Sequence, residues 1–135
     1  MELELYNQSE NENRTKSSTS LGVESVVLAG HKGAVYSGKF HPDGNLIATG
    51  GHDSLIFIWD VNNKCKNVGL LKAHKNAVLQ VDWSRNGDYL FSCSADNFAS
   101  VFDSKTFRKI RKVKGHKSFL FQILRIINSI SPCRK

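Results

Sequence analysis

Two sets of histidine, hydroxyl and carboxylate side chains recur along the chain with the same spacing. His74, Ser92 and Asp96 are the residue types of a nucleophilic triad, in which the histidine activates the hydroxyl and the carboxylate orients the histidine. The same types occur 43 residues earlier, at His31, Thr49 and Asp53. No GxSxG turn surrounds Ser92, and a residue set that recurs at a fixed period belongs to the architecture of a repeat. We therefore predict a structural role for both sets, no catalytic residues, and a protein that is not an enzyme.

The histidines and cysteines do not have the spacing of a metal site. Zinc sites combine nitrogen and sulfur ligands over short spacings, whereas Cys65, Cys93 and Cys133 lie 28 and 40 residues apart. The remaining candidates fall at equivalent repeat positions or in turns: His31, His74, His116, His41 and His52. We predict no metal, no cofactor and no small-molecule substrate. The odd number of cysteines, without a CxxC pair, also argues against a disulfide framework and fits a reducing compartment.

An internal repeat accounts for this spacing. The segment from Ala29 to Val61 aligns without gaps on the segment from Lys72 to Ser104, with each equivalent residue 43 positions later. The equivalent pairs include Val35 and Val78, Gly44 and Gly87, Trp59 and Phe102, and Asp60 and Asp103. A third start, KGHKSF, places His116 42 residues after His74. The period is therefore 42 to 43 residues, with two full copies and the beginning of a third.

Each copy has the pattern of four short strands separated by tight turns. Apolar runs are bounded by turn sequences such as HPDG and SRNG, in which glycine suits a positive φ. The predicted strands are residues 34–40, 45–50, 54–60 and 66–71 in the first copy, and 77–83, 88–94, 98–103 and 107–113 in the second. The sequence therefore predicts an all-β fold with about two four-stranded antiparallel units.

Three short motifs in the first copy resemble the WD repeat. They are the GH pair at Gly30 and His31, the PDG turn at 42–44, and the pair Trp59 and Asp60 at the end of the third strand. The resemblance extends from Val23 to Phe119 and implies four-stranded blades of a β-propeller. Two blades make an incomplete ring, since rings typically take four to eight.

The chain divides into four parts on this basis. Residues 1–22 are polar, with almost nothing to bury, and predict a flexible arm. A closing strand and the first WD repeat occupy 23–71, and the second WD repeat occupies 72–113. The fourth part, 114–135, begins a third repeat and then diverges, because no turn follows His116 where the earlier copies have one. We expect this tail to derive from a truncated or altered reading frame.

The resemblance implies a hydrogen-bonded tetrad in each blade. In the first blade it consists of His31, Thr49, Asp53 and Trp59. An indole N–H only donates, a carboxylate only accepts, and histidine and threonine do both, so a closed buried network is possible. In the second blade the equivalent residues are His74, Ser92, Asp96 and Phe102. Phe102 has no donor, so this blade is expected to lose one link, at a cost of about 1 kcal/mol if Ser92 finds no other partner.

The excess of positive charge lies near the end of the chain. The formal net charge is +7, and residues 104–135 contain ten basic residues and no acidic one. The run KTFRKIRKVKGHK at 105–117 suits either a nucleic-acid contact or a solvated outer strand, and the apolar residues within it favour the strand. Any contact with RNA is therefore expected to be indirect. No apolar stretch has the length of a membrane span or the form of a secretory signal, which predicts no membrane partner.

Several segments resemble the WD-repeat subunits of spliceosomal U5 small nuclear ribonucleoproteins. These segments are GHKGAVYSGKFHPDG, CKN, LKAH, LFS, FDSKT and KGHKSF. The resemblance implies a nuclear, non-enzymatic scaffold for protein–protein interaction in pre-mRNA splicing. One alternative is a WD-repeat scaffold of another complex, such as a ubiquitin ligase substrate receptor, although Asn62 and Lys105 replace the arginine expected there. The other alternative is a basic RNA-associated module.

Overall fold

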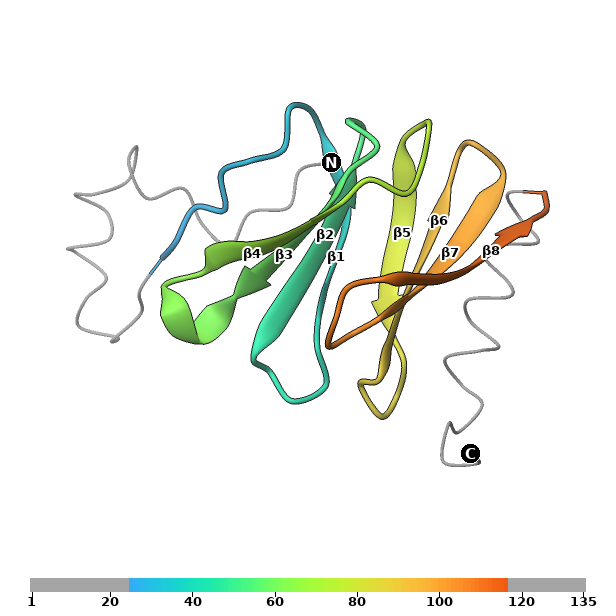
Figure 1. Cartoon of the computed structure of the whole chain (residues 1–135). Helices are drawn as coiled ribbons and strands as arrows, with labels where there is room; N and C mark the ends of the chain where they lie inside the picture. Colours follow the sequence, from blue (N-terminus) through green and yellow to red (C-terminus); the bar gives the residue numbers. More distant parts are fainter. Residues whose placement is uncertain (1–24, 117–135) are drawn as a thin grey trace.

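The computed structural model describes residues 25–116, which fold into two four-stranded antiparallel sheets with sequential strand order (Figure 1). The first sheet contains β1 (Val35–Phe40), β2 (Leu46–Gly51), β3 (Ile56–Asp60) and β4 (Lys66–Leu71). The second sheet contains β5 (Val78–Trp83), β6 (Tyr89–Ser94), β7 (Phe98–Asp103) and β8 (Lys109–Lys114). A short 3-10 helix, η2 (Val61–Asn63), connects β3 to β4. The predicted all-β fold class and the predicted strands are confirmed, within one or two residues at their ends.

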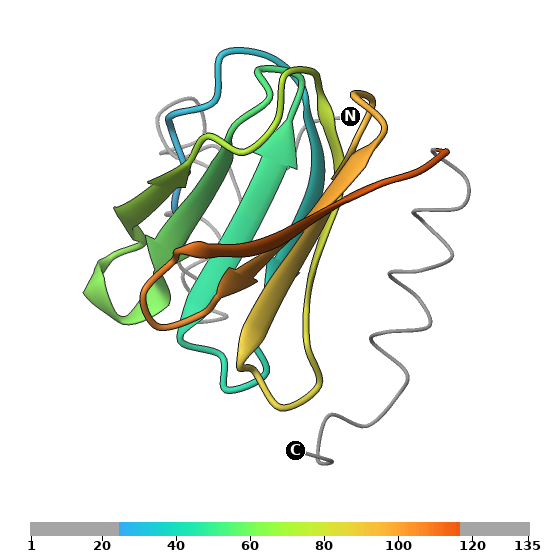
Figure 2. The ribbon, with the colours of Figure 1, turned by 45° about the vertical axis from the view of Figure 1, so that its right-hand side comes forward.

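Burial decreases from the middle strands to the last strand of each sheet. Four of the five residues of β3 and five of the six residues of β6 are buried. Every residue of β8 is exposed, and Figure 2 shows this strand as the outermost one of its sheet. The middle strands are covered on both faces, which explains why they are nearly continuous apolar runs in the sequence.

Equivalent glycine turns join the first two strands of each sheet. Gly44 and Gly87 have φ values of +81° and +82°. Their N–H groups donate to the carbonyl oxygens of His41 and Ser84, at 2.8 and 2.9 Å. A Cβ is disfavoured at positive φ, so the glycines of HPDG and SRNG direct both hairpins locally.

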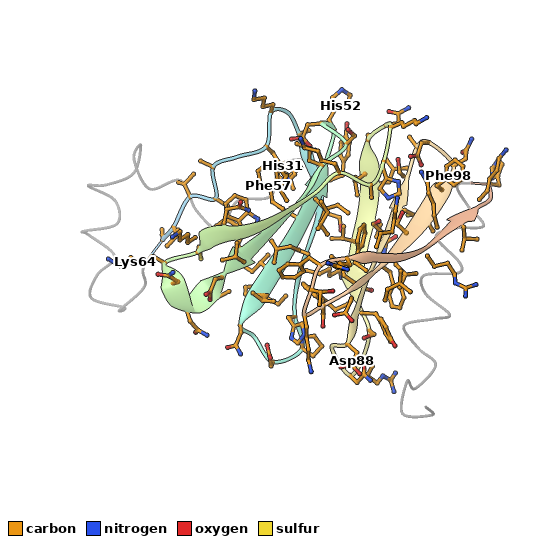
Figure 3. All side chains as sticks on the ribbon, in the orientation of Figure 1. His31, His52, Phe57, Lys64, Asp88 and Phe98 are labelled. Atoms are coloured by element: carbon orange, nitrogen blue, oxygen red, sulfur yellow. The ribbon has the colours of Figure 1, made fainter. Side chains whose placement is uncertain are left out.

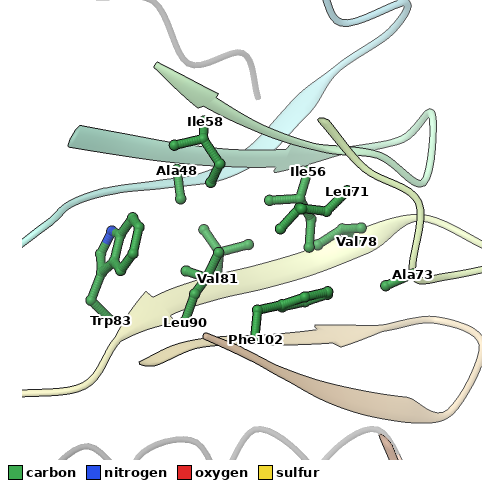
Figure 4. Close-up of a cluster of buried hydrophobic side chains, with 10 residues drawn as sticks. All are labelled: Ala48, Ile56, Ile58, Leu71, Ala73, Val78, Val81, Trp83, Leu90 and Phe102. Atoms are coloured by element: carbon green, nitrogen blue, oxygen red, sulfur yellow. The ribbon is translucent and has the colours of Figure 1, made fainter. Parts of the chain in front are cut away.

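The main hydrophobic core lies between the two sheets (Figure 4). It consists of Ala48, Ile56, Ile58 and Leu71 from the first sheet, Val78, Val81, Trp83, Leu90 and Phe102 from the second, and Ala73 between them. Gly50 allows the sheets to approach, because a Cβ there would lie 2.6 Å from Cγ1 of Val78. Apolar burial between the sheets is therefore the main force that holds them together.

The two sheets present equivalent faces in the same order along the chain. Ile47, Phe57 and Trp59 form a cluster on the face of the first sheet opposite to the main core. Two of their equivalents in the second sheet, Leu90 and Phe102, pack against the first sheet. A third cluster, formed by Phe91, Cys93 and Ala99, occupies the positions equivalent to Ala48, Gly50 and Ile56. Each sheet thus offers its successor the same kind of surface, as blades of a ring must.

The outer strand of the second sheet is shifted by one residue relative to that of the first. Trp59 in β3 lies opposite Asn67 in β4. Phe102, the equivalent of Trp59, lies opposite Lys109, whereas an offset of 43 residues would place Ile110 there. Register-equivalent residues of β4 and β8 are therefore 42 positions apart.

The turns that precede these outer strands explain the shift. Two consecutive residues before β4 have positive φ, Lys64 at +53° and Cys65 at +56°. Before β8 one residue has positive φ, Phe107 at +60°. Asp60 pairs with Lys66 across five intervening residues, whereas the N–H of Asp103 donates to the carbonyl oxygen of Arg108 across four. By pairing, the second turn is one residue shorter, which accounts for the change of the repeat period from 43 to 42 residues.

Residues 25–34 precede β1 without forming a strand. Leu28 packs against the cluster of Ile47, Phe57 and Trp59. The predicted closing strand at 23–28 would join a further blade and stays a prediction, as do the domain boundaries. The predicted arm at 1–22 and the tail after residue 116 lie outside the described residues. Between residues 25 and 116, no helix has the length and apolar character needed to cross a membrane.

Candidate functional site

The first sheet brings together the four residues of the first predicted tetrad. Trp59 Nε1 donates to Thr49 Oγ1 at 2.9 Å, and Thr49 Oγ1 lies 2.8 Å from His31 Nε2. The other ring nitrogen of His31 lies 3.0 Å from both carboxylate oxygens of Asp53. Because the carboxylate only accepts, His31 carries its proton on Nδ1, and the hydroxyl of Thr49 donates to Nε2. The hydrogen bonds of the network all run in one direction, from Trp59 to Asp53, and they fix the His31 tautomer that has its proton on Nδ1.

The imidazole of His31 also has an aromatic partner in the first sheet. It stacks on Phe57, with 4.4 Å between ring centroids and 17° between the ring planes (Figure 3). Gly30 makes this stack possible, because a Cβ at this position would overlap the Phe57 ring. Gly30 and Phe57 therefore form a packing pair that holds the histidine between the carboxylate and the hydroxyl.

Asp53 connects the segment before β1 to the β2–β3 turn. Its carboxylate accepts hydrogen bonds from the backbone N–H groups of Lys32 at 2.9 Å and Leu55 at 3.2 Å, in addition to the contact with His31. Burial opposes ionisation of this carboxyl, but the hydrogen bonds from Lys32, His31 and Leu55 outweigh it and lower the pKa of Asp53. The ionised carboxylate thus organises both turns.

The second sheet repeats this geometry with the second set of residues. His74 Nε2 lies 2.8 Å from Ser92 Oγ, and His74 Nδ1 lies 3.1 and 3.3 Å from the Asp96 oxygens. The Asp96 carboxylate also accepts from the backbone N–H groups of Lys75 and Phe98, both at 2.9 Å. Burial opposes ionisation of Asp96, but the bonds from Lys75, Phe98 and His74 outweigh it and lower its pKa.

His74 lies in a more buried environment than His31. The side chain of His74 is 0% exposed and that of His31 is 5% exposed, so both imidazoles are buried and His74 slightly more so. Burial lowers the pKa of His74, Asp96 opposes this effect, and the charges of Lys112 and Lys109 lower the pKa further. The second histidine is therefore held in its neutral form more strongly than an exposed imidazole.

The second network differs from the first at two positions. Phe102 offers no hydrogen-bond donor, and Ser92 keeps His74 as its partner. Ser100 stands where the first sheet has Phe57, opposite Ser92 on the neighbouring strand. In the part of the chain that the structure describes, Ser100 Oγ is a buried polar atom without a hydrogen-bond partner. The second network therefore has one donor fewer and lacks the stacked aromatic ring.

The connectivity of His74, Ser92 and Asp96 is that of a nucleophilic triad, but its surroundings are not. Ser92 is 0% exposed in the middle of β6. An attacking hydroxyl must reach a substrate carbonyl whose oxygen faces hydrogen-bond donors, and a fully buried strand residue does not reach one. Thr49 makes the same contact with His31 in the first sheet. The arrangement is suited to joining turns to strands.

Cys65 and Cys93, the cysteines among the described residues, have the environments of poor nucleophiles. Burial raises the pKa of the Cys93 thiol to about 12, and burial together with the Asp60 charge raises the pKa of Cys65. A protonated thiol is a weak nucleophile and a weak metal ligand. Across residues 25–116, no group of three or more histidine, cysteine or acidic side chains is placed to hold a metal ion.

A further set of polar contacts joins the two sheets, and the sequence did not predict it. Trp83 Nε1 donates to the carbonyl oxygen of Lys39 at 3.0 Å. His41 Nε2 lies 2.8 Å from the carbonyl oxygen of Gly87, and its ring packs edge-on against Trp83 at 4.8 Å between centroids. Each contact joins residues from different copies of the repeat. The sequence offered one indication of these contacts, because His41 and Trp83 had no assigned partner within their own copy of the repeat.

A family model described as "WD domain, G-beta repeat" matches residues 22–60 and 64–103. Both matches end at the third strand of a sheet, where the tetrads place Trp59 and Phe102. The chain belongs to the WD-repeat family. In this family's terms, β1–β4 and β5–β8 are two adjacent propeller blades, and the predicted fold is confirmed.

The chain is similar to WD-repeat proteins of the splicing apparatus. The U5 small nuclear ribonucleoprotein 40 kDa protein of Dictyostelium discoideum is 34% identical over 110 residues, which cover 82% of this chain and 29% of that protein. The Homo sapiens protein of the same name is 39% identical over 117 residues, covering 87% and 31%. Pre-mRNA-splicing factor cwf17 of Schizosaccharomyces pombe is 35% identical over 98 residues, covering 73% and 29%. The chain thus spans less than a third of the length of these relatives.

Two solved structures share the fold. The crystal structure of RRP9 WD40 repeats matches with a TM-score of 0.62 and 21% identity, over 67% of this chain and 28% of that chain. The structure of U3-55K matches with the same TM-score and coverage at 25% identity. These likenesses show that the two sheets are arranged as propeller blades.

Proposed function

We propose that the two blades belong to a non-enzymatic scaffold for protein–protein interaction in the U5 small nuclear ribonucleoprotein, which acts in pre-mRNA splicing in the nucleus. The observation that carries the proposal is the 34% to 39% identity with U5 40 kDa proteins, which extends over more than four-fifths of the chain. The partners are proteins of this multi-subunit complex.

The chemistry of the two tetrads supports a scaffold. Thr49 is 2% exposed and Ser92 is 0% exposed, and both hydroxyl groups bind the histidine of their own blade. The side chains that resemble a catalytic triad therefore hydrogen-bond to each other inside the blades. We assign a structural role to both tetrads, which consist of His31, Thr49, Asp53 and Trp59 in the first blade and His74, Ser92, Asp96 and Phe102 in the second. Turns and strand edges are left to bind partners.

The scaffold requires more than two blades. Propeller rings take four to eight blades, and the described residues form two sheets. The cluster of Phe91, Cys93 and Ala99 is the surface on which the next blade packs, because its equivalents in the first blade contact the second. The proposed function therefore applies to these blades within a completed ring.

Affinity purification tests the proposal. The tagged chain is expressed in cells and recovered from nuclear extract, and the bound RNA and proteins are identified. We expect U5 small nuclear RNA and its core proteins to be enriched at least tenfold over other spliceosomal small nuclear RNAs. Enrichment of cullin adaptors without U5 RNA would contradict the proposal and support the ubiquitin ligase alternative.

A matched control distinguishes specific assembly from nonspecific binding. The double variant Asp53→Ala/Asp96→Ala removes both tetrad carboxylates and the hydrogen bonds that hold the turns. We expect this variant to lose U5 RNA while a surface variant, Lys75→Gln, retains it. Equal recovery by all three chains would show that the blades are not required for the interaction.

A further inference from the structure

The outermost strand of the second blade carries a dense row of positive charge. Four of the six residues of β8 are basic, and all six are exposed: Lys109, Ile110, Arg111, Lys112, Val113 and Lys114. The sheet order ends at β8, so no described strand pairs with its outer edge (Figure 2). Four cations thus lie along about 17 Å of exposed strand, given a rise of about 3.4 Å per residue.

The equivalent strand of the first blade shows that this charge is not required by the architecture. By register with the third strand, Lys109, Arg111 and Lys112 stand where β4 has Asn67, Gly69 and Leu70. Both strands are outermost and both have an exposed apolar residue at the register shift, Val68 and Ile110. One lysine on an edge strand already disfavours edge-to-edge pairing, and β4 has a single one, Lys66. The three further charges of β8 need another explanation.

The charges of β8 are not neutralised by neighbouring carboxylates. Among residues 25–116, no ion pair includes a side chain of β8. The acidic residue nearest in sequence, Asp103, instead accepts the backbone N–H groups of Lys105 and Thr106 at 2.7 and 3.1 Å. Lys112 is held over the ring of Phe98, with Nζ 4.2 Å from the centroid. Within residues 25–116, the strand is therefore a cationic surface without a paired carboxylate.

We infer that β8 binds the sugar–phosphate backbone of single-stranded RNA directly and without base specificity. Lysine and arginine supply most protein contacts to phosphate, and neutralising phosphates releases counterions from the nucleic acid. Three of the four basic residues of β8 are lysines, and lysine is depleted from protein–protein interfaces. This composition favours a nucleic acid over an acidic protein. The contact is direct, whereas the sequence led us to expect an indirect one.

Fluorescence anisotropy with a labelled oligouridine of about 20 nucleotides tests this inference on the full chain. The variant Lys109→Asn/Arg111→Gln/Lys112→Gln removes the charges specific to β8. We expect its affinity to fall on the order of a hundredfold at about 50 mM salt, and the slope of log K against log salt to decrease by about 2, since each single-strand contact contributes about 0.7. Circular dichroism confirms that the variant retains its β structure.

The control variant Lys64→Gln/Lys66→Gln/Lys72→Gln removes the same net charge from the outer part of the first blade. Both variants keep the four basic residues after position 116, so binding through that segment is common to them. We expect the control to bind within about threefold of the unmodified chain, since few phosphate contacts change. An equal loss in both variants would show that only net charge matters and would overturn the inference.

Two further outcomes would also overturn it. One is the absence of RNA binding by the unmodified chain at low salt. The other is equally tight binding of poly-glutamate through the same three side chains, which would assign β8 to an acidic protein. Neither outcome bears on the proposed role in U5 assembly, because the anisotropy assay contains no splicing component and the purification experiment is evaluated separately.

Discussion

The two blades share one hydrogen-bonded skeleton but hold it in different surroundings. The face of the first blade that contains Trp59 is opposite to the main core, whereas the equivalent face of the second blade, with Phe102, packs against the first. His74 is therefore buried between the sheets, with 0% of its side chain exposed, whereas His31 is buried against Phe57 in the first sheet, with 5% exposed. The comparison shows that the same polar skeleton forms on the face away from the main core and on the face that packs against the neighbouring sheet.

Three residues that pack around the tetrad histidine all differ between the two blades. Where the first blade has Gly30, Phe57 and Trp59, the second has Ala73, Ser100 and Phe102. A Cβ at position 30 would overlap the Phe57 ring. Ala73 in the second blade is therefore compatible with Ser100, but it would not be compatible with a phenylalanine at position 100. The residues around a tetrad thus change together while its hydrogen bonds remain.

The largest expected effect comes from the carboxylates that the blades share. Asp53→Ala and Asp96→Ala each leave two backbone N–H groups and one imidazole without an acceptor. We expect each variant to lose about 3 kcal/mol of unfolding free energy in urea denaturation. Equal losses would show that the hydrogen bonds set the cost. A loss at Asp96 larger by 2 kcal/mol or more would show that burial between the sheets sets it instead.

The exchange of packing residues is expected to have the next largest effect. Gly30→Ala should cost about 2 kcal/mol, because the new methyl group displaces the Phe57 ring from His31. The double variant Gly30→Ala/Phe57→Ser reproduces the second blade, and its cost should be smaller than the sum of the single costs by about 1 kcal/mol. The four unfolding free energies form a double-mutant cycle. Strict additivity would contradict the idea that these two residues change as a unit.

A smaller effect is expected when the first tetrad is converted to the second. Trp59→Phe removes the donor to Thr49 while His31 keeps its contact with the hydroxyl, so we expect a loss of about 1 kcal/mol. Ser100→Ala is the matched control in the second blade, since its hydroxyl has no partner there. Thermal denaturation should show a lower melting temperature for the first variant and no decrease for the second. A destabilised Ser100→Ala would show that this hydroxyl contributes to the second network.

The smallest effect is expected from pH, through His74 in the second blade. Burial lowers the pKa of His74 below its ordinary value of 6.5, so the unfolded chain binds a proton that the folded chain resists. The contribution of His74 to stability is therefore complete above pH 6.5 and decreases as the pH falls below 6.5 toward the lowered pKa of the folded state. His74→Gln should reduce this pH dependence in urea denaturation. An unchanged slope in the variant would mean that other groups cause it.

The sequence predicted what is local or repeated. The strands follow from apolar runs between glycine turns and the repeat follows from its period, and the resemblance to the WD repeat implied the tetrad residues. The start of β8 was predicted at residue 107 and lies at Lys109, because Phe107 forms the shorter turn with a positive φ. A single residue in a turn changes the register of a strand without altering its apolar pattern, so this shift could not be found from the pattern.

The contacts between the sheets could not be predicted for a different reason. Trp83 bonds to Lys39, and His41 bonds to Gly87, across a separation of 44 to 46 residues. The partners in both cases are backbone carbonyls, which every residue possesses, so the side chains do not reveal them. Only the approach of one sheet to the other selects which carbonyl each side chain meets.

The sequence by itself determined the strands and the repeat, because turn chemistry, strand alternation and a 43-residue period are properties of the chain alone, and its resemblance to the WD repeat implied the members of both tetrads. The tertiary structure decided which tetrad lies between the sheets, which strand edge is exposed and where the charges of β8 stand relative to β4. The physical reason is that desolvation and charge proximity depend on distances between segments far apart in the chain, and packing of one blade against the next sets those distances.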